Sequence, residues 1–176
     1  MLKTRIKATK PLIAVLLVCL FALSGCSSEG DAKAFVVFNS QLGDFSIQLS
    51  KAYGDKKQEE ASGFLMTTFT HDSGKQIRIV EEKAPSYKVD DVYFEEELKA
   101  DAELHVERTE KLEMESFGTV YGALIEDHTL MQNLFYYKFN VGVNVATVLF
   151  SQTGPISEVD EKQIKQAIST LKLLKP

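Results

Sequence analysis

The strongest constraint on the fold is a series of three apolar segments in the second half of the chain. Thr119–Ile125, Gln132–Phe139 and Val143–Phe150 are dense in β-branched and aromatic residues, which are enriched in β-strands. Only two short polar turns, at Glu126–His128 and Asn140–Gly142, separate them. Strands joined by short turns pair side by side and run in opposite directions. The sequence therefore predicts an antiparallel meander.

The first half of the chain adds further strands. Phe45–Leu49 alternates apolar and polar residues, which is the pattern of a half-buried strand. Gly63–Thr70 and Gln76–Val80 are predicted to form a hairpin, because Asp72–Gly74 between them has the composition of a turn. The stretch from Lys51 to Ser62 is polar and charged, and we expect it to be a surface loop or a short helix.

Two helices are predicted around these strands. Asp90–Ala102 is rich in Glu, Lys, Leu and Ala, which favours a short middle helix, and Leu104–Met114 follows it as a polar strand. Ser157 with Asp160 three residues later fits a capping box. Beyond it an apolar stripe recurs at helical spacing, formed by Ile164, Ala167, Ile168 and Leu171. Residues 35–176 are thus predicted to be one α+β domain, with an antiparallel β-sheet packed against a long C-terminal helix and a shorter middle helix.

The first 25 residues have the composition of a signal peptide. Basic residues come first, namely Lys3, Arg5, Lys7 and Lys10. The apolar run Pro11–Leu23 follows them and is shorter than the roughly 20 apolar residues that span a bilayer. A positive end before a short apolar segment is the layout of an export signal. We therefore expect residues 1–25 to direct export and to be removed.

The residues at the end of this run are Leu23, Ser24, Gly25 and Cys26. They resemble the lipobox of bacterial lipoproteins, in which the cysteine becomes the first residue and carries acyl chains such as palmitate. The resemblance implies lipid attachment at Cys26, with residues 26–34 as a flexible tether to the domain. The protein would then be lipid-anchored to the cell membrane or outer membrane, on its extracytoplasmic side. The alternative is an ordinary signal peptide with a chance cysteine.

Charge and cysteine content exclude several classes of function. Beyond the leader, sixteen basic and twenty-five acidic residues remain, so the formal charge of the mature chain is −9. This charge repels the phosphate backbone, and nucleic-acid binding is not expected. The only other cysteine, Cys19, lies in the apolar run of the leader. With Cys26 acylated, no thiol remains for a disulfide, a zinc thiolate site or a cysteine nucleophile.

Two segments of the domain resemble those of a known superfamily. Asp44–Ser50 is similar to the opening strand of proteins with the Mog1/PsbP-like fold, and Val145–Phe150 leading to Ile164–Leu171 is similar to their closing strand and helix. Bacterial lipoproteins of the DcrB type belong to this superfamily. The aromatic residue that commonly follows the first strand, often tryptophan, is at best Tyr53, since the chain has no tryptophan. The resemblance implies an α/β sandwich and a non-catalytic binding or accessory module, and it supplies no active-site residue.

Residues that could support catalysis or metal binding are scattered. Glu103, His105 and Glu107 alternate, so on a strand they would share one face where a divalent cation could bind. The neighbouring charged residues, such as Arg108 and Glu110, favour a solvated face of mixed charge instead. No nucleophile elbow, glycine-rich phosphate loop or metalloprotease spacing occurs. We expect neither enzyme activity nor a cofactor, and we assign no metal site.

The strand Gln132–Phe139 carries large side chains on both faces. Burial on both sides of the sheet explains this pattern without any function. If a helix covers only one side, Tyr136 or Tyr137 would mark an exposed binding surface. The sequence thus favours a membrane-anchored envelope lipoprotein that binds a protein partner. The alternative is a small-ligand or metal-binding lipoprotein associated with a transporter, and a hydrolase ranks third.

Overall fold

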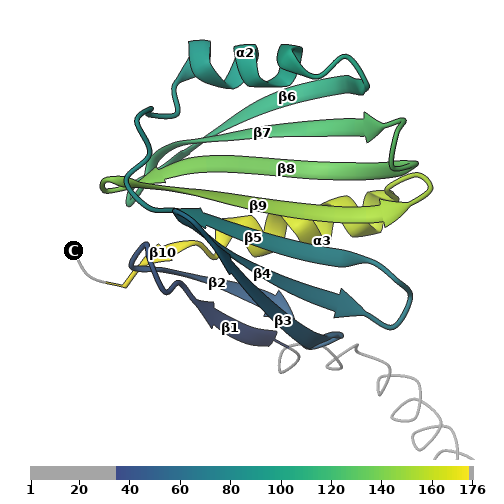
Figure 1. The fold of residues 1–176 in the computed structure, drawn as a ribbon. Coiled ribbons are helices and arrows are strands. Elements are labelled where there is room, and N and C mark those ends of the chain that lie inside the picture. The colour runs from purple at the N-terminus through teal and green to yellow at the C-terminus, as the bar shows by residue number, and fades with distance from the viewer. Residues whose placement is uncertain (1–34, 175–176) are drawn as a thin grey trace, which may run out of the picture. The chain divides into compact units, whose positions relative to one another are not determined.

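The computed structural model describes residues 35–174, which form two antiparallel β-sheets and two helices (Figure 1). The large sheet has the strand order β3-β4-β5-β9-β8-β7-β6, and the small sheet has the order β1-β2-β10. The strands are β1 (Phe35–Asn39), β2 (Phe45–Ser50), β3 (Tyr53–Ala61), β4 (Phe64–His71), β5 (Gln76–Glu82), β6 (Leu104–Met114), β7 (Gly118–Asp127), β8 (Gln132–Val141), β9 (Asn144–Thr153) and β10 (Lys172–Leu173). The predicted signal peptide, the lipobox Leu23–Cys26 and the tether lie outside the described residues.

Both faces of the large sheet are covered. One face packs against the small sheet and α3 (Glu158–Ser169), and the other packs against α2 (Asp91–Ala100). Alternation along β7 shows the division, because Val120 belongs to the first core while Tyr121 and Ala123 belong to the second. The predicted meander is confirmed as β7, β8 and β9, and its large side chains on both faces are explained by this double cover.

The core beneath the small sheet is the larger of the two. Phe45, Ile47 and Leu49 of β2 are fully buried against the large sheet, and Ile168 of α3 is fully buried beside them. Each such side chain stabilises the fold by about 1.5–3 kcal/mol relative to an exposed one. The ring of Phe45 packs edge-on to that of Phe139, with centroids 5.5 Å apart. β2 is therefore the strand that fixes the small sheet onto the large one.

Both helices begin where the sequence predicts. The Asp90 side chain accepts a hydrogen bond from the Tyr93 N–H at the start of α2. The Ser157 side chain accepts one from the Asp160 N–H at the start of α3, so the predicted cap is present. α2, the middle helix, has 10 residues and is only slightly shorter than the C-terminal α3, which has 12. No helix within residues 35–174 is long and apolar enough to cross a membrane.

Two strands differ from the expectation. β3 occupies the polar stretch where a loop or short helix was expected, and every residue after Tyr53 in it is exposed. Such a strand has no apolar periodicity, and its pairing with β4 holds it in place. β1 was not expected as a strand either. It pairs with β2 from Phe35 opposite Ser50 to Asn39 opposite Ser46.

Candidate binding edge

The edge strands of the two sheets differ in how they are protected from pairing with another chain. An edge strand exposes unpaired N–H and C=O groups, and proteins block such edges with charges, bulges or short strands. β3 carries a row of exposed charges, from Asp55 to Glu60. β6 carries charges and a bulge between Val106 and Arg108, and β10 has only two residues. These three edges are blocked.

β1 is the edge without such protection. It contains no charged residue, and Phe35, Val36 and Val37 are 39%, 39% and 55% exposed. An exposed apolar strand at a sheet edge, with neither a charge nor a bulge, is a template for strand addition. Among the described residues, β1 pairs only with β2, so its outer side is unpaired. We therefore take this outer side of β1 as the candidate site and call it the β1 edge.

The hydrogen-bond pattern shows which backbone groups the β1 edge offers. In an antiparallel pair, the N–H and C=O of one residue point to the same side, and that side alternates along the strand. The Ser40 N–H donates to the Phe45 carbonyl at 2.8 Å, so Ser40 points toward β2. The N–H of Gln48, opposite Val37, donates instead to Thr170 Oγ1 at 2.8 Å. Phe35, Val37 and Asn39 thus direct their N–H and C=O groups outward.

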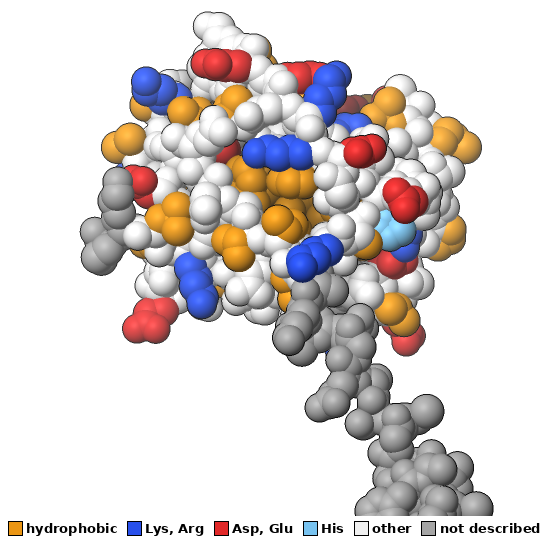
Figure 2. Space-filling model, turned by 90° about the horizontal axis from the view of Figure 1, so that it is seen from below, with side chains coloured by type: hydrophobic (Ala, Val, Ile, Leu, Met, Phe, Trp, Pro, Cys, Tyr) orange, Lys and Arg blue, Asp and Glu red, His pale blue; other side chains and the backbone are white. Residues whose placement is uncertain are grey.

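A hollow lies on the side of the domain where β1 and β3 form the two edges. Figure 2 shows this side, with hydrophobic side chains on the floor of the hollow and basic side chains at its margin. Phe38 of β1 packs edge-on to Phe69 of β4, with ring centroids 5.8 Å apart. The Lys56 Nζ of β3 lies 5.9 Å from the centre of the Phe38 ring. β1 and β3 are thus linked here by one cation–π contact, and no strand lies between them in the described part of the chain.

The lysines near the β1 edge differ in their partners. Lys57 points away from the hollow and pairs with Glu59, with Nζ and Oε1 2.5 Å apart. Lys56 shares the inner face of β3 and forms no ion pair with any described residue. Lys51, which follows β2 beside Phe35, also forms none within residues 35–174. The margin of the hollow therefore carries positive charge that no described carboxylate neutralises.

The loop that follows β1 is held by a buried carboxylate. Glu81 of β5 is 1% exposed, and its carboxylate accepts hydrogen bonds from the Ser40 hydroxyl and the backbone N–H of Leu42. A third, longer bond comes from the Gln41 N–H at 3.4 Å. The carboxylate thus satisfies backbone donors that would otherwise be left without partners. It fixes the C-terminal end of β1 to the large sheet.

The exposed surface considered at Tyr136 and Tyr137 is not formed. Tyr137 is fully buried, and its hydroxyl donates to Glu110 at 2.7 Å. Gly122 makes room for the ring, since a Cβ there would lie 2.7 Å from its Cε1 atom. Burial, and then the hydrogen bond to Glu110, raise the pKa of Tyr137 above its usual range. A helix on each side of the sheet explains the difference from the expectation.

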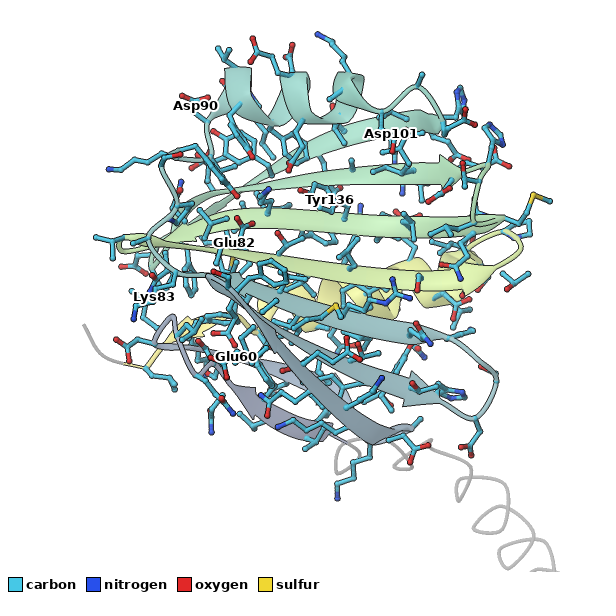
Figure 3. The ribbon with its side chains drawn as sticks, in the orientation of Figure 1. Glu60, Glu82, Lys83, Asp90, Asp101 and Tyr136 are labelled. Atoms are coloured by element: carbon cyan, nitrogen blue, oxygen red, sulfur yellow. The ribbon has the colours of Figure 1, made fainter. Side chains whose placement is uncertain are left out.

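Tyr136 belongs to a polar cluster beneath α2 (Figure 3). Its hydroxyl donates to Glu97 at 2.6 Å, and the same carboxylate pairs with the buried Lys138 at 2.5 Å. The Lys138 Nζ lies 5.2 Å from the ring centres of both Tyr87 and Tyr93. Burial is the main cause that raises the pKa of Tyr136, followed by the charge of Glu97. These contacts provide partners for the buried Lys138 ammonium group. The role of the cluster is therefore structural, because it holds α2 and the linker before it on the large sheet.

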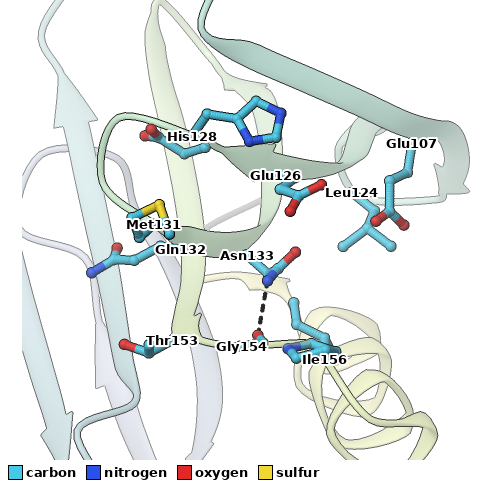
Figure 4. Close-up of a pocket in the computed structure, with 12 residues that line it drawn as sticks. Glu107, Leu124, Glu126, His128, Met131, Gln132, Asn133, Thr153, Gly154 and Ile156 are labelled. Atoms are coloured by element: carbon cyan, nitrogen blue, oxygen red, sulfur yellow. Dashed lines mark hydrogen bonds between the residues drawn. The ribbon is translucent and has the colours of Figure 1, made fainter.

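His105, which was considered as a cation ligand, lies close to His128, and His128 lines a pocket of about 560 Å³ at the turn between β7 and β8 (Figure 4). His105 and His128 have ring centroids 6.3 Å apart, and Glu107 falls in the β6 bulge. Glu107, Glu126 and His128 line the pocket together with apolar side chains such as Met131. No group of three His, Cys, Asp or Glu suited to a metal occurs among residues 35–174. The bulge removes the simple alternation on which the cation hypothesis depended.

Comparisons with known proteins bear on the fold. No protein-family model matches the chain, and no curated protein matches its sequence. The structure is similar to that of cyanobacterial PsbP (CyanoP) from Synechocystis sp. PCC 6803, with a TM-score of 0.58 and 10% sequence identity. The match covers 86% of this chain and 99% of that one. The likeness shows a PsbP-like fold, mostly antiparallel β-sheet with two helices.

Proposed function

We propose that this chain is a lipid-anchored lipoprotein of the bacterial cell envelope whose domain is a non-catalytic module that binds a protein partner. The lipobox-like sequence Leu23–Cys26 supports the anchor. The partner-binding role rests on the β1 edge, which is apolar and unpaired where the other edges of the described residues are charged, bulged or short. CyanoP, with the same fold, is a PsbP protein, and this likeness is consistent with an accessory role.

The proposed tether would keep the β1 edge close to the membrane. Phe35 lies nine positions after Cys26, and a random-coil chain of that length has a root-mean-square span of roughly 15–18 Å. A lipid on Cys26 would therefore keep β1 within a few nanometres of the membrane surface. A partner that binds there would be a membrane protein, or another protein held at the same surface.

The anchor is tested by substitution of the two cysteines. Cells that express the wild type, Cys26→Ala or Cys19→Ala are grown with labelled palmitate. We expect label on the wild type and on Cys19→Ala, and none on Cys26→Ala, because only Cys26 would be acylated. Label on the Cys26→Ala protein would refute the lipobox.

The partner is tested by a photo-crosslinking residue in the full chain in its own membrane. The residue is placed at Val37 on the β1 edge and, as a control, at Val143, which is 76% exposed between β8 and β9. We expect one reproducible protein adduct from position 37 and none from position 143. Adducts from neither position would count against a protein partner. Calorimetric titration with zinc and copper separates the metal-binding alternative, since tight stoichiometric binding would favour it.

A further inference from the structure

We propose that the β1 edge accepts an extended segment of its partner as an additional strand, and that this segment carries apolar residues at alternate positions with an acidic residue near one end. This inference deepens the proposed protein-binding function and rests on it. The partner strand would extend the small sheet to the order partner-β1-β2-β10.

The backbone of β1 is the first argument. Phe35, Val37 and Asn39 direct their N–H and C=O groups away from β2, so the edge offers a ladder of alternating donors and acceptors. An extended peptide satisfies such groups with its own main chain, as in other cases of strand addition. A lipid surface supplies no comparable set of partners, and burying unpaired backbone groups in hydrocarbon costs several kcal/mol for each group. The edge therefore favours a strand over a membrane.

The side chains of β1 indicate the apolar character of the partner. Val36 and Phe38 face the large sheet, because they share the inner face of the small sheet with Ile47. Phe38 is 4% exposed, whereas Val36, on the same face of β1, is 39% exposed. A partner strand would place every second side chain on this inner face, over the hollow. Those side chains are expected to be apolar, because they would cover Val36 and the floor near Phe69.

Charge indicates the remaining feature of the segment. Lys51 lies next to Ser50, the partner of Phe35 at the start of β1, and Lys56 lies over the ring of Phe38; neither lysine pairs with a carboxylate among the described residues. A partner carboxylate would neutralise this charge, whereas a second copy of this chain would bring further lysines and an uncharged β1 strand. The charge therefore favours a foreign acidic segment over self-pairing.

The test selects peptides and then compares four variants. The full chain, purified in detergent, is panned against a display library of random short peptides. We expect enrichment of peptides that alternate apolar residues and carry an acidic residue. Val37→Pro removes an outward N–H without touching the bonds to β2, and it should weaken binding of a selected peptide by roughly tenfold or more. Val37→Thr keeps that N–H and should bind within about threefold of the wild type.

Charge variants provide the second comparison, with Lys57 as the matched control. Lys56→Glu should weaken the selected peptide by roughly tenfold, whereas Lys57→Glu, on the opposite face of β3, should leave the affinity unchanged. Circular dichroism melting shows whether each variant is folded. If Val37→Pro fails to fold, the Lys56 and Lys57 pair still tests the proposal, together with amide protection in the peptide complex at Phe35, Val37 and Asn39.

Several outcomes would overturn strand addition. The selection could fail to enrich any peptide, or Val37→Pro could bind a selected peptide as tightly as the wild type does. Ultracentrifugation could show that the chain dimerises through β1. The chain could also bind anionic vesicles in a way that depends on Val37. In membranes, an adduct from a crosslinker at Phe35 that persists undiminished in the Val37→Pro variant would keep the protein partner and reject only the strand. Absence of any adduct would reject the proposed function itself.

Discussion

β1 and β3 are both edge strands, and they are built in opposite ways. β3 is polar and exposed along almost its whole length, so its position depends on backbone pairing with β4. β1 has one deeply buried anchor, Phe38, and three exposed apolar residues around a free edge. The comparison shows that this domain protects one edge with charge and leaves another open. The proposed binding site rests on this difference between the two edges.

The largest effect is expected from loss of the β1 anchor. Phe38→Ala removes a side chain that packs against Phe45 and Phe69, and we expect the free energy of unfolding to fall by about 3–5 kcal/mol. On β3, Gln58→Ala should cost less than about 1 kcal/mol, because it loses one hydrogen bond to Thr67. Urea denaturation of both variants measures the contrast. Equal losses would show that β1 and β3 are held alike.

Glu81 provides the next effect, because it holds the loop that ends β1. Glu81→Ala leaves the Ser40 hydroxyl and the Leu42 N–H without their acceptor, and we expect a loss of about 1–3 kcal/mol. Hydrogen exchange should increase at the amides of residues 40–43, while β3 amides stay unchanged. Increased exchange in β3 alone would contradict this assignment.

The pH dependence of stability tests the ion pair between the β4–β5 turn and α3. Burial raises the pKa of Asp160, but the hydrogen bonds from Lys75 and Ser157 outweigh it and lower the pKa below its usual value. A lowered folded-state pKa means stability that is present at neutral pH and is lost as the pH falls below about 4. Lys75, on the turn between β4 and β5, thereby fixes the β3–β5 side to α3. Lys75→Met should remove about 0.5–1 kcal/mol at neutral pH and flatten the stability curve in acid.

Val37→Lys would make β1 resemble β3. We expect the free energy of unfolding to change by less than about 0.5 kcal/mol, since Val37 is 55% exposed. The adduct from a crosslinker at position 35 should decrease, because a charge on the edge blocks pairing. An undiminished adduct would show that the partner contacts another surface.

The smallest effect is expected at the ion pair on β3. Lys57 and Glu59 are both largely exposed, so Lys57→Ala should alter the free energy of unfolding by less than about 0.5 kcal/mol. Denaturation at low and high salt provides the measurement. A larger loss would mean that charge stabilises β3 and does more than block its edge.

Periodicity explains which parts of the fold were predictable. β7, β8, β9 and α3 carry apolar patterns that local sequence reveals, whereas α2 is indicated by composition; the caps at Asp90 and Ser157 are local signals too. β3 has no such pattern, because a strand held by backbone pairing alone leaves no trace in its side chains. Tyr137 was ambiguous since its burial depends on elements distant in sequence, including Glu110 on β6.

The candidate site was harder to predict than the fold. The apolar run Phe35–Phe38 is visible in the sequence and is a usable sign of a strand. Nothing local shows that this strand lies at an edge, because that depends on β2 pairing with β10 on its other side. The unpaired state of Lys56 likewise depends on which residues β3 brings near it. Whether a strand lies at an edge depends on the topology of the sheet. It cannot be predicted from a single sequence whose strand pairing is unknown.

The pairing of Ser46 in β2 with Lys172 in β10 has a consequence for the order of folding. The small sheet joins β1 and β2 to β10, so it is completed only after Lys172 and Leu173 have emerged from the ribosome or a translocation channel. Until then the apolar residues of β1 and β2 lack part of their cover while the rest of the chain arrives. A truncation before Lys172 would leave the β1–β2 hairpin with a second open edge, because β2 would lose its pairing with β10. During synthesis, the small sheet therefore cannot close until β10 has been made, although β1 and β2 are made first.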